Sequence, residues 1–251
     1  MKTMRLIKSV LVVFAAAVTF ASCNDDDDYV YIGAGMPNAL VTIKPTDTGN
    51  FYMQLDNKTT MYPVNVNKSP YGDKEVRALV NCYRVETIAS DNVFGNSISV
   101  FVNWMDSIRT KPTEAYPATD VDKKYGNDPV EIVNDWVTVA EDGYLTLRFR
   151  TRWGGRGTVH YVNLLAGGNA NDSYEVEFRH DAKGDTNGTW GDALVAFKLP
   201  ETIKIGDKEK KLTLKYKSFT GEKTVQFDLE SGKGTLVKND NDRAAYSVRV
   251  K

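Results

Sequence analysis

The chain has 251 residues, of which 41% are hydrophobic and 26% charged, a composition typical of a folded globular protein that excludes a chain unable to build a core. Beyond residue 22 it carries 29 basic and 33 acidic side chains, and four of the acids form a single run, so the remainder is electrically balanced. Nucleic-acid binding depends on Lys and Arg neutralising phosphates, so we expect no nucleic-acid partner.

Residues 1–22 have the pattern of an export signal. Lys2, Arg5 and Lys8 form a basic start, and residues 9–22 are uncharged and rich in Val, Ala and Phe. As a helix these fourteen residues would span about 21 Å, which is less than the roughly 30 Å of a bilayer core. A cleaved signal peptide is therefore favoured over a transmembrane helix.

The apolar run ends in Phe20-Ala21-Ser22-Cys23. Small residues before a cysteine resemble the lipobox of bacterial lipoproteins, in which the thiol receives acyl chains such as palmitate, although Phe20 replaces the usual Leu. The alternative is an ordinary signal peptide with an incidental Cys23. Because two or three acyl chains anchor a protein stably, we expect attachment to the membrane through lipid on Cys23.

An acidic run of four residues follows Cys23 almost at once, and its members are Asp25, Asp26, Asp27 and Asp28. Like charges repel, so residues 23–36 are predicted to form an extended, lipidated tether. The run also resembles the signal that exports lipoproteins of Bacteroides-type bacteria to the cell surface. We therefore expect a lipid-anchored protein of the outer membrane that is exposed at the surface; a simple acidic tether is the alternative.

Residues 37–113 are predicted to form a small β domain. Five segments carry apolar side chains at every second position, namely 39–43, 51–55, 60–64, 78–88 and 97–105. Five strands in so short a stretch fit an OB-like barrel or a compact sheet. Cys82 lies in the fourth segment and, with Cys23 acylated, has no partner for a disulfide, so we expect a buried thiol.

The alternation stops between the two halves of the chain. Residues 114–130 are polar and bracketed by prolines, which is typical of a linker. Residues 131–251 then alternate again, with predicted strands at 136–139, 144–153, 158–165, 174–180, 193–199, 212–218 and 225–229, and a further strand or ordered tail at 246–250. Seven short antiparallel strands with one apolar face each predict a β-sandwich, which makes the whole protein all-β.

Three segments of the second half carry a family resemblance. Gly143-Tyr144-Leu145-Thr146-Leu147-Arg148-Phe149 is followed by His160-Tyr161-Val162-Asn163-Leu164 and by Glu177-Phe178-Arg179-His180-Asp181-Ala182-Lys183-Gly184-Asp185. Their order and spacing resemble the NigD-like lipoproteins of Bacteroides-type bacteria, with Thr146 and Asp181 where Asn is common. The resemblance implies an N-terminal OB-type barrel and a C-terminal β-sandwich. It also implies a link to bacteriocin immunity and no catalytic residues.

The only two histidines, His160 and His180, are predicted to face inward from consecutive strands of one hairpin, with Asp185 close enough to turn back to a ring. A neutral, hydrogen-bonded His pair is the favoured interpretation, and a metal site of two His and one carboxylate is the alternative. Trp153 is expected in the core. Asp185, Asn187 and Thr189 alternate like a calcium loop, but Trp190 replaces the required Gly. We expect no metal and no cofactor.

Arg148, Arg150 and Arg152 lie on one face of a predicted strand. They form either a stripe that binds an anionic ligand or, as the favoured interpretation, an outer face paired with Glu175, Glu177 or other acids on neighbouring strands. The triplet Asp106-Ser107-Ile108 resembles an O-glycosylation acceptor of Bacteroides-type bacteria, on three residues only.

The chain lacks the nucleophile, zinc and phosphate-loop motifs of common enzymes, so we expect a non-catalytic protein. The leading hypothesis is binding of a glycan or protein partner at the cell envelope. A bacteriocin immunity or accessory protein, or a structural subunit of a surface assembly, are the alternatives.

Overall fold

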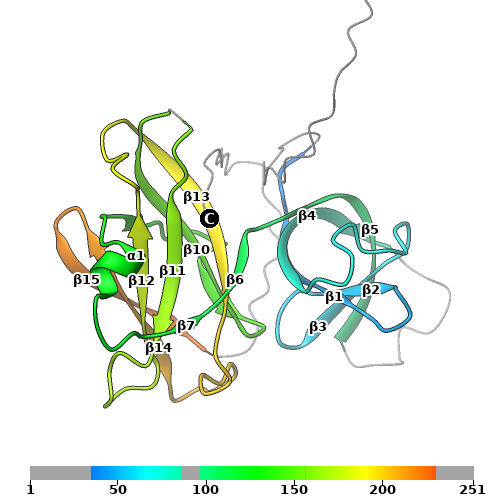
Figure 1. Ribbon diagram of the computed structural model, residues 1–251. Coiled ribbons are helices and arrows are strands. Elements are labelled where there is room, and N and C mark those ends of the chain that lie inside the picture. The colour runs from blue at the N-terminus through cyan, green and yellow to red at the C-terminus, as the bar shows by residue number, and fades with distance from the viewer. Residues whose placement is uncertain (1–34, 86–95, 156, 230–251) are drawn as a thin grey trace, which may run out of the picture.

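The computed structural model describes residues 35–85, 96–155 and 157–229, which fold into a barrel and a sandwich (Figure 1). Cys23, the acidic run and the predicted strand at 246–250 lie outside these residues. In the part of the chain that is described, no helix is both long and apolar enough to cross a bilayer.

The N-terminal domain is a closed barrel of five strands. These are β1 (Ala39–Pro45), β2 (Phe51–Gln54), β3 (Thr59–Pro63), β4 (Val76–Arg84) and β5 (Asn96–Ser107). Their order is β1-β2-β3-β5-β4, and β4 pairs back to β1. Alternate side chains such as Met53 and Met61 point inward and fill the barrel, and Cys82 is buried among them. Burial raises the pKa of the Cys82 thiol to about 11, so it stays protonated at neutral pH.

The C-terminal domain packs two five-stranded sheets face to face. The first sheet contains β6 (Thr110–Pro112), β8 (Glu131–Ile132), β9 (Val139–Glu141), β10 (Tyr144–Trp153) and β13 (Thr189–Lys198). The second contains β7 (Glu114–Ala115), β11 (Tyr161–Ala166), β12 (Glu175–Asp181), β14 (Lys211–Ser218) and β15 (Gly221–Asp228). Phe149 and Phe178 meet between the sheets with ring centroids 5.3 Å apart, so the predicted apolar faces form one core.

The all-β class, with a barrel followed by a sandwich, is confirmed. Within the described residues the sandwich nevertheless has ten strands instead of seven, and the pairs β6–β13, β7–β11 and β12–β14 are parallel. Strands of two or three residues are too short to show an alternating pattern. Strand direction depends on the path of the chain between strands, which the alternation does not reveal.

The segment predicted to be a linker, residues 114–130, is part of the sandwich. β7 pairs with β11, and the helix α1 (Val121–Tyr125) lies against β11 and β12 with Tyr125 buried. Arg179 of β12 donates a hydrogen bond to the carbonyl of Gly126. The linker interpretation was therefore wrong. The prolines separate short elements of the sandwich: β7 extends the edge of the second sheet, and α1 lies against β11 and β12. The domain boundary lies between β5 and β6.

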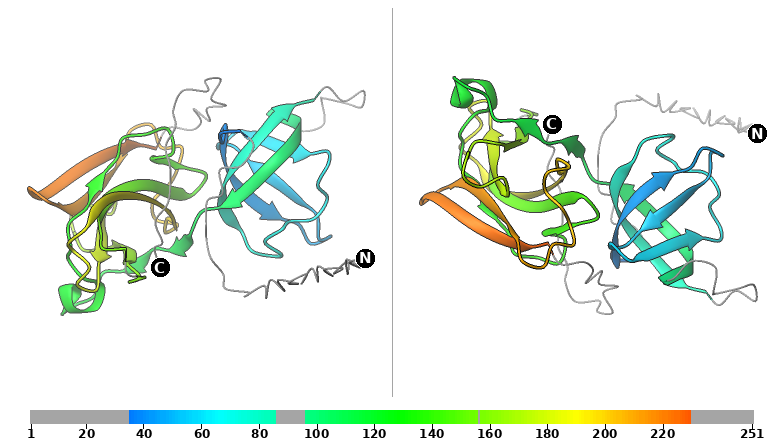
Figure 2. Two further views of the ribbon diagram at one scale, coloured as in Figure 1. Left: turned by 90° about the horizontal axis from the view of Figure 1, so that it is seen from above. Right: turned by 90° about the horizontal axis from the view of Figure 1, so that it is seen from below.

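The barrel packs on the outer face of the first sheet, as the two views of Figure 2 show. Leu40 and Leu79 of the barrel join Leu194 and Ala196 of β13 in a separate apolar cluster. Tyr144 of β10 donates a hydrogen bond to Glu75, just before β4, at 2.6 Å. The two domains therefore share apolar and polar contacts.

Candidate functional site

The two histidines contact each other at one end of the sandwich. His160 precedes β11, and its Nδ1 lies 2.9 Å from Nε2 of His180 on β12, while its Nε2 lies 3.3 Å from the carboxylate of Asp185. Both rings are buried. Trp153 stacks on His160 at 3.9 Å between ring centroids and is itself in the core. The structure thus brings together the three residues that the sequence grouped.

A chain of hydrogen bonds follows from the chemistry of these groups. A carboxylate only accepts, so His160 donates from Nε2 to Asp185 and accepts at Nδ1 from His180. Burial lowers the pKa of His160, and burial together with the neighbouring His160 lowers the pKa of His180 to about 4. Both rings are therefore neutral at pH 7.

The geometry of this cluster indicates a structural role, in which it holds the surrounding segments together. The Asp185 carboxylate also accepts from the backbone N–H of Gly154, where an added Cβ would lie 2.0 Å from Oδ1 of Asp185. Asp185 and His180 bond opposite sides of the His160 ring, so the three do not converge on a common point. Within the described ranges no group of three or more His, Cys, Asp or Glu is arranged to hold a metal ion.

The predicted arginine stripe is engaged by acids from its own sheet and a nearby loop. Arg148 and Arg150 donate to Asp192 of β13, and Arg148 also reaches Asp135. Arg152 donates to the carbonyl of Gly188 and lies over the Trp190 ring. The predicted face paired with acids on neighbouring strands is therefore present, with Asp192 as the acid on the adjacent strand. Glu175 and Glu177, which were named as partners, lie on the other sheet. Sequence alternation indicates the face of a residue but not which strand lies beside it.

The triplet Asp106-Ser107-Ile108 ends β5 beside β4. Ser107 lies opposite Ala78 in the strand pair, and Ile108 is buried at the contact between the domains.

Aromatic side chains that the sequence analysis did not single out gather on the outer face of the barrel. Tyr52 of β2 and Tyr62 of β3 point away from the barrel core, with ring centroids 6.3 Å apart. On the neighbouring strands, Phe101 of β5 and Tyr83 of β4 are register partners whose rings stack at 5.3 Å and 17°. Tyr62 is 43% exposed and Tyr83 is 52% exposed. We call these four side chains the aromatic face.

Uncharged polar groups border the aromatic face on β3 and β5, and Lys44 of β1, which is paired with Asp142, lies opposite Tyr52. Tyr62 is paired with Ser99, and Thr60 is paired with both Gln54 and Ser97, so an aromatic row lies beside a polar row. The outward positions on β2, on β3 and on β5 as far as Phe101 carry no charge, although 26% of the whole chain is charged. The sequence does contain a signal for this face. In each of the pairs Tyr52-Met53 and Met61-Tyr62, a Tyr stands next to a Met that points into the barrel, so both tyrosines must point outward.

Comparison with known proteins agrees with this architecture. The model of the NigD-like N-terminal OB domain matches residues 40–108, and that of the NigD-like C-terminal beta sandwich domain matches residues 112–229. The two matched ranges divide where β5 gives way to β6. A search of curated proteins found no match.

Solved structures of bacterial proteins are similar to this chain. A protein of Parabacteroides distasonis described as toxin related is 29% identical, with a TM-score of 0.61 over 79% of this chain and 93% of that one. A protein of unknown function from Bacteroides vulgatus is 24% identical, with a TM-score of 0.58 over 76% and 89%. A NigD-like immunity protein from Bacteroides caccae is 21% identical, with a TM-score of 0.49 over 78% and 93%.

The resemblance noted in three sequence segments is thereby confirmed across both domains. Since the two family models together match well over half of the chain, this protein belongs to the NigD-like family.

Proposed function

We propose that this protein is a non-catalytic, glycan-binding lipoprotein of the cell envelope, and that its ligand lies on the aromatic face of the barrel. The observation that carries this proposal is the outward-facing aromatic row of the half-buried Tyr52 and the exposed Tyr62 beside an uncharged polar row. Surface anchoring through Cys23 follows from the lipobox-like N-terminus.

The chemistry of the face suits a neutral sugar chain. Aromatic rings present large apolar surfaces that cover the C–H face of a sugar ring, at little cost in side-chain entropy. Beside the rings, the Thr60 hydroxyl donates to the side-chain oxygen of Gln54, and both oxygens keep acceptor capacity for sugar hydroxyls. A phosphate-rich ligand would need several cations, whereas the one beside Tyr52, Lys44, is already paired with Asp142.

The position on the fold supports the same ligand class. OB barrels commonly bind oligosaccharides or oligonucleotides on the face formed by their second and third strands, which here carry Tyr52 and Tyr62. This is an argument from the fold, and the residues on the face supply the chemical preference.

A glycan array probed with the mature chain tests the proposal. We expect saturable binding to at least one neutral glycan, and we expect the Tyr52→Ala/Tyr62→Ala variant to weaken it at least tenfold. Tyr161→Ala is a matched control, because Tyr161 is 40% exposed but lies on β11 of the sandwich. Binding that is unchanged in the double variant, or absent from all glycans, contradicts the proposal.

A protein toxin is the second candidate ligand. The 29% identical protein from Parabacteroides distasonis is described as toxin related, and its match covers most of both chains. Cells that express the protein would then survive a bacteriocin that kills cells lacking it. Protection that is lost in the Tyr52→Ala/Tyr62→Ala variant, with an empty glycan array, would assign the aromatic face to a toxin.

A further inference from the structure

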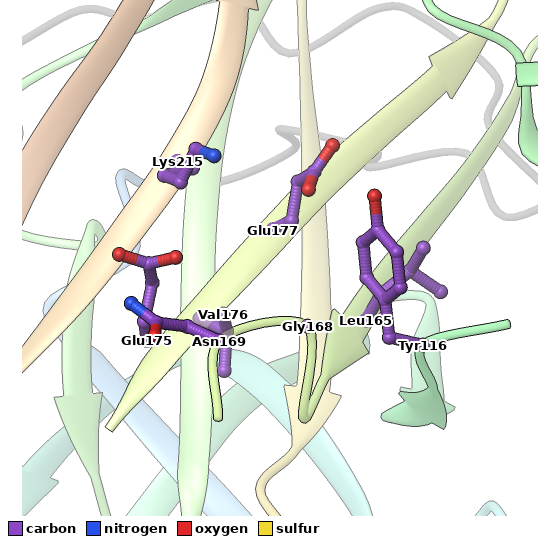
Figure 3. A pocket seen from close by; sticks show the side chains of 8 residues that line it. All are labelled: Tyr116, Leu165, Gly168, Asn169, Glu175, Val176, Glu177 and Lys215. Carbon is purple, nitrogen blue, oxygen red and sulfur yellow. The ribbon is translucent and has the colours of Figure 1, made fainter. Parts of the chain in front are cut away.

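A shallow pocket of about 70 Å³ opens on the outer face of the second sheet of the sandwich (Figure 3). Tyr116 forms one wall, because its backbone N–H donates to the carbonyl of Ala166 and continues the pairing of β7 with β11. Its ring lies on Gly168, where an added Cβ would come within 2.7 Å of a ring carbon. The polar side chains around the pocket are Tyr116, Asn169, Glu175, Glu177 and Lys215.

Four of these five side chains retain polar groups that are not used inside the protein. Among the described residues, the Glu175 carboxylate, the Lys215 ammonium and the Tyr116 hydroxyl make no hydrogen bond or ion pair. Asn169 accepts through its side-chain oxygen from the N–H of Asn171 and keeps its amide N–H groups for another partner. All four side chains are half-buried.

This arrangement differs from the other polar clusters of the sandwich. His160, Arg148 and Arg179 each bond to acids from neighbouring segments, which is the behaviour of a structural cluster. Partly buried polar groups that share a pocket but do not bond to one another are partners for a ligand. Tyr116 lies in the segment predicted to be a linker, so nothing in the sequence indicated a pocket beside Glu175 and Glu177.

The charges around the pocket indicate a neutral ligand. Glu177 is neutralised by Arg179 at 2.6 Å, and the negative Glu175 is offset by the positive Lys215. Lys215 would repel a cation and Glu175 would repel an anion, whereas a neutral ligand is repelled by neither. A hydroxyl group both donates and accepts, so adjacent hydroxyls on one ring can bond a carboxylate and an ammonium together.

We propose that this pocket binds a single neutral sugar residue, as a second carbohydrate site separate from the aromatic face. The Tyr116 ring supplies the apolar wall, Glu175 accepts from sugar hydroxyls, and Lys215 and Asn169 donate to them. The choice of ligand class rests on the glycan-binding function proposed above, whereas the site itself rests on the free polar groups. The small volume suits the polar edge of one ring better than an extended chain.

NMR titration of the ¹⁵N-labelled mature chain tests this site, with the methyl glycosides of glucose, galactose, mannose and N-acetylglucosamine as probes. For at least one probe we expect saturable shifts of the Gly168 and Val176 backbone amides and of the Asn169 side-chain amide. Glu175→Gln keeps the shape of the side chain and should raise the Kd at least threefold. Glu222→Gln, an exposed change on β15, should leave the Kd unchanged.

Absence of saturable shifts at Gly168 and Asn169 with all four probes would overturn the second site, as would an identical Kd for the Glu175→Gln variant. The two proposals fail separately, because the Tyr52→Ala/Tyr62→Ala variant should retain these shifts. An empty glycan array with intact pocket shifts would reject the barrel site alone, and array binding without pocket shifts would reject the pocket alone.

Discussion

Arg77 of β4 and Glu141 of β9 form an ion pair across the boundary between the barrel and the sandwich, and the arginine side chain is fully buried. The same guanidinium donates to Thr42 of the barrel and to Thr146 of β10. A buried charge is stable only when paired and hydrogen-bonded, so this contact depends on both domains being docked.

Arg77→Ala should lower the free energy of unfolding by about 3–5 kcal/mol, because it leaves Glu141 buried without its counter-ion. Urea denaturation at pH 7 measures the change. Lys211→Ala is the control, since it removes a pair with Asp228 in which both side chains are more than half exposed, and it should cost at most about 1 kcal/mol. Equal midpoints for Arg77→Ala and the unmodified protein would refute a stabilising role for the buried pair.

Cleavage by trypsin between Lys123 and Lys124 should leave the two fragments associated. The fragment that contains the barrel keeps β6 and β7, and both are paired with strands of the other fragment. Size-exclusion chromatography of the nicked protein should therefore show one peak at the intact mass, which separates into two in urea. Two peaks without denaturant would restore the interpretation of residues 114–130 as a linker.

Stability should fall as the pH drops from about 6.5 towards 4. The folded state holds the pKa of His180 at about 4, whereas the unfolded chain has the ordinary value near 6.5, so in this window the unfolded state binds more protons. The contribution of His180 is complete above pH 6.5, and its loss approaches about 3 kcal/mol at pH 4.

Urea denaturation at pH 7.5, 6.0, 5.0 and 4.5 measures this dependence. The pKa values of Asp181 and Asp192 are lowered below the ordinary 3.8, so their contributions are lost at more acidic pH than this window. His180→Phe should be less stable at pH 7.5 and should show a flatter profile. A flat profile for the unmodified protein would contradict neutral, buried histidines.

Cys23→Ser should release the protein from the membrane fraction. The prediction rests on the small residues before Cys23 and on the fourteen-residue apolar run. Intact-mass analysis of detergent-extracted protein should show two or three acyl chains on an N-terminal Cys23. A mature N-terminus at another residue, or a Cys23→Ser protein that still partitions into detergent, would disprove acylation.

The sequence by itself determined the longer strands, because alternation of apolar side chains is a local property of a strand. Leu145, Leu147 and Phe149 repeat at period two, and all three are buried in the sandwich core. The same logic placed His160 and His180 on inward faces of consecutive strands. It missed their register by two residues, since Val162 and not His160 lies opposite His180.

Only the tertiary structure decided which elements are neighbours. Asp192 meets Arg148 because β13 pairs with β10, although Glu175 and Glu177 had looked equally suitable in the sequence. Likewise, Tyr116 closes a pocket over a strand sixty residues further along the chain. Strand order, strand direction and the packing of loops arise from contacts between distant segments. Alternation every two residues specifies which face of a strand each side chain occupies, but it does not specify which strand lies beside it.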